Sequence, residues 1–299
     1  MRKVLILGGS GMLGHTLFRY LSEDSSLEVF ATVRSSKELS GWMPTDRMKK
    51  VCRDVDIHQT DRIMKVFAEM KPDLVVNCIG IIKQVPEAQD PLATITTNAL
   101  LPHRIALLCG ATGARMIHVS TDCVFDGEKG GYAESDFPNA TDLYGRTKLL
   151  GEIDYPHCVT LRTSIIGHEL KGNYGLVEWF LSQEKKVRGF REAIYSGFPT
   201  VELARIIRDY VIPNSEMMGL YHVSSDPISK YELLKLINVQ YDKNVVIEPE
   251  DSFRLDRSLD SSRFRSLTGY NPPTWTDLVR EMHLDYLQGP YQNGKAKGE

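Results

Sequence analysis

The sequence predicts an α/β fold in which a doubly wound parallel Rossmann sheet carries a smaller mixed α/β substrate-binding domain. Short apolar strands alternate with helical patterns over the first half of the 299 residues, which is typical of βαβ units. The first strand, Val4 to Leu7, leads directly into a glycine-rich turn and a helical pattern. After about residue 165 the alternation loosens, which indicates a second, smaller unit.

The elements of the first half follow from their apolar periodicity. Leu13, Leu17 and Leu21 recur at near-helical spacing and predict a helix over residues 13–21. Ile63 and Phe67 lie on one face of a helix predicted over 60–70. The remaining members of the alternation are strands at 27–33, 50–53, 74–78 and 116–119 and a helix at 97–109.

In the second half of the chain, helices are predicted mainly from the capping signals at their first residues. A strand is predicted at 220–223, and Ser229 to Glu232 has the spacing of a capping box before an apolar run. Thr274 to Asp277 is a similar signal for the start of a helix. We therefore predict a cofactor-binding domain over 1–164 with a return of the chain at 195–224, a substrate-binding domain from 165–194 and 225–287, and a flexible tail over 288–299.

Composition excludes several classes of function. The formal net charge of −3 gives no global field toward nucleic acid or an anionic membrane. No run approaches the roughly 18 to 20 apolar residues that span a bilayer. Five cysteines form no CxxC pair, so a reducing cytoplasm is expected rather than a disulfide framework. The histidines show no metal-ligand spacing, so no metal is expected.

The turn after the first strand has the pattern of a dinucleotide-binding loop. Residues 8–14 read GGSGMLG and fit both GxGxxG and GxxGxxG. Glycines allow the tight turn and let a pyrophosphate approach the backbone, and the helix that follows offers free N–H groups. The alternative is a simple strand-to-helix turn. The predicted cofactor contacts in this loop are Gly8, Gly11, Met12, Leu13 and Gly14.

Arg34 ends the second strand, 20 residues after Gly14. An acidic residue there would favour NAD, whereas an arginine pairs with a 2′-phosphate and favours NADP. A solvated surface arginine remains the alternative, and so NAD stays possible. Asp54 and Val55 are predicted beside the adenine, although Asp54 could equally be a helix N-terminal carboxylate. Gly80, after the fourth strand, would let the backbone pass close to the cofactor.

Tyr144 and Lys148 form a YxxxK pair. Residues four apart lie on one face of a helix, so the phenol and the ammonium point together. We expect the cation to lower the pKa of the phenol, and a lowering by about three pH units would correspond to roughly 4 kcal/mol. Thr121 follows the fifth strand, 23 residues before the tyrosine. Its hydroxyl could bond a substrate carbonyl while Tyr144 donates the proton.

Together these motifs resemble the extended short-chain dehydrogenase/reductase family, and more narrowly its dTDP-4-dehydrorhamnose reductase subfamily. The resemblance covers most of residues 1–287 and rests on the glycine loop, the YxxxK pair and five further groups of matches. Those matches are Val119 to Gly127, Leu161 to Ser164, Gly197 to Ala204, Gly219 to Val223 and Ser258 to Asp260.

The resemblance implies reduction of the C4 ketone of a nucleotide-linked 4-keto-6-deoxyhexose by NADPH, for deoxysugar or polysaccharide biosynthesis. Tyr144 would donate the proton, Lys148 would tune it and hold the nicotinamide ribose, and Thr121 would polarise the carbonyl. Asp122 and Cys123 would border the substrate. Lys83, Asn173 and Arg257 are the other predicted substrate contacts, with the last two meeting the diphosphate or the base.

Several alternatives stay open. The segments 77–84 and 193–196 depart from the subfamily pattern, so a UDP-linked, N-acetylated 4-ketohexose competes with the dTDP sugar, and an epimerase with the reductase. A dehydratase is disfavoured because Cys123 stands where the second acid of its pair belongs. A rival of another class is a non-catalytic NADP-binding regulatory subunit. A homodimer is expected from the family alone.

Overall fold

The structure is a computed structural model that describes residues 1–35 and 45–291. Its centre is a seven-stranded sheet in the order β11-β6-β5-β4-β1-β2-β3, with every neighbouring pair parallel. The predicted α/β fold class is confirmed. The strands are β1 (Arg2–Leu7), β2 (Leu27–Thr32), β3 (Val51–Cys52), β4 (Leu74–Asn77), β5 (Arg115–Thr121), β6 (Cys158–Thr163) and β11 (Gly219–His222).

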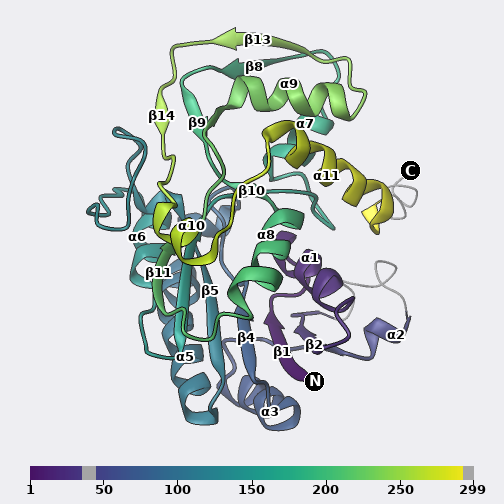
Figure 1. The fold of residues 1–299 in the computed structure, drawn as a ribbon, viewed down its shortest axis with the longest axis vertical. Helices are drawn as coiled ribbons and strands as arrows, with labels where there is room; N and C mark the ends of the chain where they lie inside the picture. The colour runs from purple at the N-terminus through teal and green to yellow at the C-terminus, as the bar shows by residue number, and fades with distance from the viewer. Residues whose placement is uncertain (36–44, 292–299) are drawn as a thin grey trace.

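Helices cover both faces of this sheet because its strands are apolar on both sides (Figure 1). Val4 and Ile6 of β1 pack toward α1 (Met12–Leu21) and α8 (Thr200–Ile206). Leu5 and Leu7 point to the other face and pack toward α3 (Thr60–Met70) and α5 (Leu101–Thr112). On the edge of that second layer lies α6 (Leu143–Leu150), which packs against β5.

The strand order reverses beside β1, which has β2 on one side and β4 on the other. A crevice opens at the carboxyl ends of parallel strands at such a point, and ligands bind there in open α/β sheets. The loops that follow β1, β4 and β5 therefore meet at one edge of the sheet. These loops carry the glycine turn, residues 78–84 and residues 121–123.

Smaller sheets lie beyond this edge, with β8, β9, β13, α7 and α9 gathered at the top of Figure 1. They pair β7 with β10, β9 with β12 and β14, and β8 with β13. The predicted caps are present: Ser229 accepts from the Glu232 N–H, and Thr274 from the Asp277 N–H. The elements are β7 (Ile165–Ile166), α7 (Leu176–Leu181), β8 (Lys186–Phe190), β9 (Ala193–Tyr195), β10 (Phe198–Pro199), β12 (Ile228–Ser229), α9 (Lys230–Gln240), β13 (Val246–Glu250), β14 (Leu255–Asp256), α10 (Ser262–Thr268) and α11 (Trp275–Gln288).

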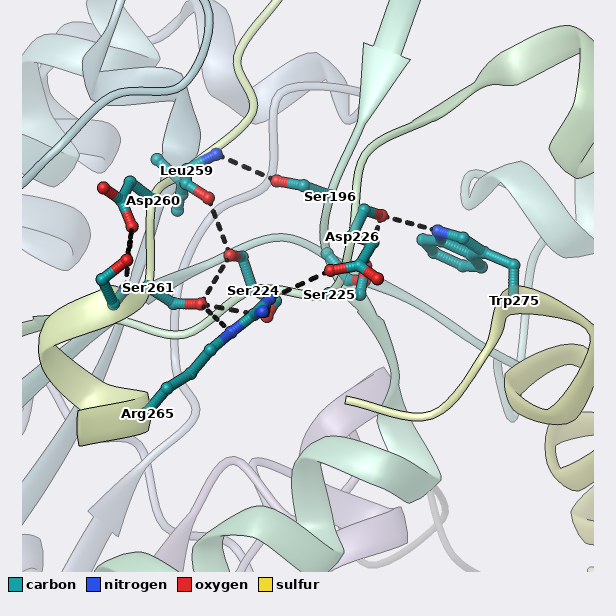
Figure 2. A network of polar contacts seen from close by, with 11 residues as sticks. Ser196, Ser224, Ser225, Asp226, Leu259, Asp260, Ser261, Arg265 and Trp275 are labelled. Carbon is teal, nitrogen blue, oxygen red and sulfur yellow. Dashed lines mark hydrogen bonds and ion pairs between the residues drawn. The ribbon is translucent and has the colours of Figure 1, made fainter. Parts of the chain in front are cut away.

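A serine-rich network holds three distant loops together below these sheets (Figure 2). Ser224 donates to the carbonyl of Leu259 at 2.8 Å, and the N–H of Leu259 donates to Ser196 at 3.0 Å. Arg265 donates to the carbonyl of Ser224 at 3.2 Å and pairs with Asp226 at 3.3 Å. The network fixes the segments that carry residues 193–195 and 255–257 toward the central sheet.

Three parts of the structure differ from the sequence-based expectation. The helix predicted over 97–109 begins at residue 91, because Asp90 caps α4 (Pro91–Thr94) and a π-helical turn, Ile95–Leu100, continues into α5. The strand β6 was not predicted. The remaining short elements are α2 (Thr45–Met48), two 3₁₀ turns (Pro86–Gln89, Asp122–Val124) and a second π-helical turn (Ile207–Val211).

The predicted flexible tail begins too early. Gln288 is the last residue of α11, and Tyr291 is buried with 2% of its surface exposed. Its hydroxyl lies 2.8 Å from Nε2 of His15 on α1. An amphipathic residue that fills a site and finds a polar partner orders the chain around it. Residues 292–299 of the predicted tail lie outside the described residues.

Candidate active site

A cavity of about 750 Å³ lies at the carboxyl edge of the central sheet. One wall is the glycine turn, and the others come from the loops after β4 and β5, from α6 and from the smaller sheets. Most of the predicted site residues line it. The lining residues are 10–13, 78–84, 119–123, 144, 148, 163–166, 169–171, 175–176, 194–195, 230, 255 and 257.

The glycine turn has the geometry of a phosphate cradle. Gly8 has φ +85, in the left-handed region that favours glycine. A Cβ on Gly14 would lie 2.0 Å from the carbonyl oxygen of Gly8, so the helix can pack this closely only with glycine there. Gly11, Met12 and Leu13 line the cavity. Within the described residues no side chain caps α1, so its first N–H groups remain available to an anion.

The other predicted cofactor residues lie at the neighbouring strand ends. Arg34 is exposed just after β2. Val55 is buried, and its N–H donates to the carbonyl of Val33 at 3.0 Å, so residues 54–55 sit beside the end of β2. Asp54 has φ +56, which holds the backbone in a tight turn at this edge. Because residue 55 is hydrogen-bonded to residue 33, Arg34 and Asp54 lie along the same edge of the crevice.

Thr121, Tyr144 and Lys148 converge on the cavity from two elements. Thr121 ends β5, and its Oγ1 donates to Oδ1 of Asp122 at 3.1 Å and accepts from the Cys123 N–H at 3.1 Å. Tyr144 and Lys148 lie one turn apart on α6, which Asp142 caps by accepting from the Gly145 N–H. The Nζ atom of Lys148 donates to the carbonyl of Val119 at 2.9 Å.

The electrostatics differ from the sequence-based expectation in one respect. Burial raises the pKa of Tyr144, and a hydrogen bond with Thr121 only partly opposes the rise. The expected lowering of this pKa by the neighbouring cation is therefore wrong for this structure, because burial of the phenol raises the pKa; Lys148 donates to the Val119 carbonyl. Burial lowers the pKa of Lys148 to about 8. At neutral pH the phenol therefore holds its proton and can donate it.

The predicted substrate-binding residues fall into two groups. Asp122, Cys123, Lys83 and Arg257 line the cavity, whereas Asn173 is exposed and does not. Burial raises the pKa of Asp122, and it raises the pKa of Cys123 to about 12. The Nζ atom of Lys83 pairs with Asp142 at 3.0 Å. The Arg257 side chain donates to the carbonyl of Phe125 at 2.7 Å, which fixes its position at the wall.

The loop after β4 is held by a side chain of the π-helical turn. The N–H of Ile81 donates to Oδ1 of Asn98 at 2.8 Å, and Nδ2 of Asn98 donates to the Ile81 carbonyl at 3.0 Å. A Cβ on Gly80 would lie 3.4 Å from that Asn98 oxygen and 3.8 Å from Nζ of Lys148. Gly80 thus lets the loop pass close to the predicted catalytic residues.

Sequence reasoning missed two cationic residues of the cavity, Lys171 and Lys230. Lys230, the first residue of α9, lines the wall, and burial lowers its pKa while Asp122 opposes the change. The capping motif at Ser229 indicated a helix start and nothing more, because the approach of residue 230 to residue 122 is a product of the fold. Glu169 was missed for the same reason; it lines the cavity and accepts from the Tyr174 N–H at 2.9 Å.

No group of three or more His, Cys, Asp or Glu side chains among the described residues is arranged to hold a metal ion. No helix among them is long and apolar enough to cross a membrane.

Comparison with known proteins gives a consistent picture. A family model described as the RmlD substrate binding domain matches residues 1–287. The dTDP-4-dehydrorhamnose reductase of Aggregatibacter actinomycetemcomitans is 25% identical over 291 residues, which are 94% of this chain and 92% of that protein. This relative is named as a reductase of a nucleotide sugar, so the predicted oxidoreductase class is confirmed.

Two other matches add information. The solved dTDP-4-dehydrorhamnose reductase of Bacillus anthracis, in complex with NADP, superposes with a TM-score of 0.77 over 95% of this chain and 99% of that one. At 22% identity this likeness shows the fold alone. Methionine adenosyltransferase 2 subunit beta of Xenopus tropicalis is 27% identical over 256 residues, which are 78% of this chain and 70% of that protein.

Proposed function

The chain belongs to the RmlD substrate binding domain family, and from that premise we propose that it reduces the C4 ketone of a nucleotide-linked 4-keto-6-deoxyhexose with NADPH. One observation carries the proposal. Thr121, Tyr144 and Lys148 meet in the same cavity as the uncapped N-terminus of α1, so hydroxyl, phenol and ammonium adjoin a phosphate cradle. No packing requirement brings these groups together at a nucleotide loop.

The residues divide the reaction between them. NADPH, when bound along the glycine turn, supplies the hydride. Tyr144 gives its phenolic proton to the carbonyl oxygen, so that the ketone becomes an alcohol and the phenolate is left behind. Thr121 orients that oxygen by a hydrogen bond. Lys148, with its proton in place, stabilises the phenolate and holds the ribose.

The cofactor preference follows from Arg34. Arg34 is exposed just after β2, where the 2′-phosphate is expected, and a forked donor suits that group. We therefore propose NADPH over NADH. Asp54 and Val55 would border the adenine.

The substrate end of the cavity is assigned to the residues that line it away from the glycine turn. Asp122, Cys123, Lys83 and Arg257 are the proposed contacts, with Arg257 toward the diphosphate. A dTDP sugar is the first choice, and a UDP-linked N-acetylated sugar is the alternative. We place the reaction in deoxysugar or polysaccharide synthesis, and in a reducing cytoplasm because the five cysteines are free.

The test follows NADPH absorbance with purified protein and a panel of dTDP- and UDP-4-keto-6-deoxyhexoses. Oxidation with one sugar identifies the substrate, and the same sugar with NADH measures the cofactor preference. Replacement of Arg34 by Gln should raise KM for NADPH more than for NADH. Tight NADPH binding with no oxidation by any sugar would contradict the proposal.

A second candidate is a non-catalytic NADP-binding subunit of another enzyme, which the likeness to methionine adenosyltransferase 2 subunit beta favours. The intact Thr121, Tyr144 and Lys148 speak against it, because a chain that only binds the cofactor has no need of a proton donor. Co-purification of a partner enzyme with a chain that turns over no sugar would support this candidate.

We also propose a homodimer. Leu92 before the π-helical turn, Leu107 on α5 and Leu150 at the end of α6 are 79%, 61% and 64% exposed. Exposed apolar side chains of this size are what an association surface would bury. Analytical ultracentrifugation should give twice the chain mass of 33.8 kDa. A single species at the chain mass would contradict a dimer.

A further inference from the structure

We propose that Glu152 is a positioning residue for the reaction, because it ties the helix that carries Tyr144 and Lys148 to the strand that carries Thr121. The inference rests on the proposed function. Glu152 lies two residues after the end of α6 and accepts a hydrogen bond from the Ser120 hydroxyl at 2.7 Å. Ser120 directly precedes Thr121 on β5.

The attachment has two points on consecutive residues of β5. Lys148 donates to the carbonyl of Val119 at 2.9 Å. Glu152, four residues later in the chain, accepts the hydrogen bond from the Ser120 hydroxyl. The end of α6 is thus joined to β5 immediately before Thr121. Because the proton donor and the carbonyl-orienting hydroxyl sit on different elements, this junction sets the distance between them.

The carboxylate of Glu152 is itself held in place. Arg162 of β6 donates from Nε to Oε1 and from Nη2 to Oε2, both at 2.7 Å. The Arg162 side chain is 3% exposed, and its third contact, Nη1 to Nε2 of His222, measures 3.2 Å. A bidentate pair of this kind fixes direction as well as distance. Glu152 is therefore a rigid anchor rather than a solvated carboxylate.

The same carboxylate acts on the ammonium group. Burial lowers the pKa of Lys148, and Glu152 is the first of the groups that oppose it, followed by Cys78. Burial raises the pKa of Cys78 to about 12, raises that of Tyr144 and lowers that of His118, so these three neighbours of Lys148 are neutral near pH 7. Among the described residues, Glu152 is thus the carboxylate that acts on Lys148.

The test compares Glu152→Gln with the parent chain by NMR titration of ε-¹³C-labelled lysine, with Lys148 assigned through Lys148→Met. The amide keeps the size of the side chain and removes its charge. The pKa of Lys148 should fall by about one pH unit. In the assay with the accepted 4-keto sugar, the alkaline limit of kcat should move down by the same amount.

Three variants separate positioning from a merely structural role. Ser120→Ala removes the hydroxyl and keeps the charge, so kcat should fall while the pKa of Lys148 stays unchanged. Glu152→Asp should restore most of the Lys148 pKa, and Glu128→Gln, at an exposed glutamate, should change neither quantity.

An unchanged Lys148 pKa in folded Glu152→Gln would overturn the inference, as would an unchanged kcat in Ser120→Ala. Should Glu152→Gln fail to fold, Glu152→Asp and Ser120→Ala still decide the matter. The titration needs no sugar substrate. A failure of the proposed function would appear as absent turnover in the parent chain, with the shift of the Lys148 pKa intact.

Discussion

At the scale of single residues, the account depends on the state of two titratable groups in one cavity. Tyr144 keeps its proton because burial raises its pKa, and Lys148 is charged below about pH 8. A protonated phenol next to a cation is the arrangement that a ketone reduction requires, since the proton leaves at the moment when negative charge develops on oxygen.

Replacement of Tyr144 by Phe should lower kcat by about a hundredfold to ten-thousandfold, because the substrate oxygen loses its proton donor. NADPH affinity should stay within about twofold, since the ring remains and Lys148 is untouched. Stopped-flow absorbance measures the first quantity and fluorescence titration the second. A variant with unchanged kcat would remove Tyr144 from the mechanism.

The rate should fall as pH rises through about 8. The folded-state pKa of Lys148 is lowered to about 8, so the ammonium is present below that pH and is lost above it. A neutral amine no longer stabilises the phenolate of Tyr144. The measurement is kcat from pH 6 to 10 at saturating NADPH, with the fold checked by circular dichroism. A rate that rises or stays level between pH 8 and 9.5 would contradict this role of Lys148.

The part of the site that depends on local spacing in the sequence could be predicted. The part that depends on contacts between distant residues could not. Tyr144 and Lys148 could be paired because four residues along a helix always share a face. Glu152 and Lys230 could not be assigned, because their partners Ser120 and Asp122 are 32 and about a hundred residues away. The direction of the Tyr144 pKa was also out of reach, since burial decides it.

At the scale of elements, the site depends on how tightly the turn after β1 joins α1. The patterned strands and helices of the first half were predictable because each is apolar at its own period. The strand β6 escaped because it buries Thr160 and Arg162. Their polar groups are satisfied by the Ile153 carbonyl at 2.7 Å and by Glu152, contacts that no local pattern reveals.

Two alanine substitutions in the glycine turn should separate folding from cofactor binding. Gly14→Ala places a Cβ 2.0 Å from the Gly8 oxygen, so the free energy of unfolding should fall by about 3 kcal/mol. Gly11→Ala meets only that same oxygen, at 3.4 Å, and should cost about 1 kcal/mol as a weaker N-cap. Urea denaturation measures both variants.

The extra methyl of Gly11→Ala would stand where the cofactor phosphates approach, so NADPH affinity should fall by more than about tenfold, or 1.4 kcal/mol. Isothermal titration calorimetry measures this affinity. Full NADPH affinity in Gly11→Ala would contradict the placement of the pyrophosphate on the turn.

At the scale of the whole molecule, the ends of the described chain meet behind the cofactor turn. His15 of α1 lies 2.8 Å from the Gly11 carbonyl through Nδ1 and 2.8 Å from the Tyr291 hydroxyl through Nε2. Arg19 pairs with Asp285 beside them. The segment after α11 therefore supports the helix that carries the phosphate cradle, although its composition predicted a loose tail.

Removal of the Tyr291 hydroxyl by substitution with Phe should lower the free energy of unfolding by about 1 to 2 kcal/mol. His15 is 1% exposed, and its Nε2 atom would lose the 2.8 Å contact with Tyr291 without gaining water. Thermal or urea denaturation measures the loss. Tyr174→Phe, at a half-exposed tyrosine, is the matched control and should change stability little. Equal stability of the Tyr291 variant and the parent would show that the contact contributes nothing.

The central claim is transfer of a hydride to C4 of a nucleotide-linked 4-keto sugar with a proton from Tyr144. The most direct measurement supplies NADPH with deuterium at both nicotinamide C4 positions, with the keto sugar accepted in the panel, and locates the label in the product by NMR. The account predicts deuterium at C4 of the sugar with the parent chain, and far slower labelling with Tyr144→Phe. A sugar product without deuterium, or with deuterium at another carbon, would contradict it.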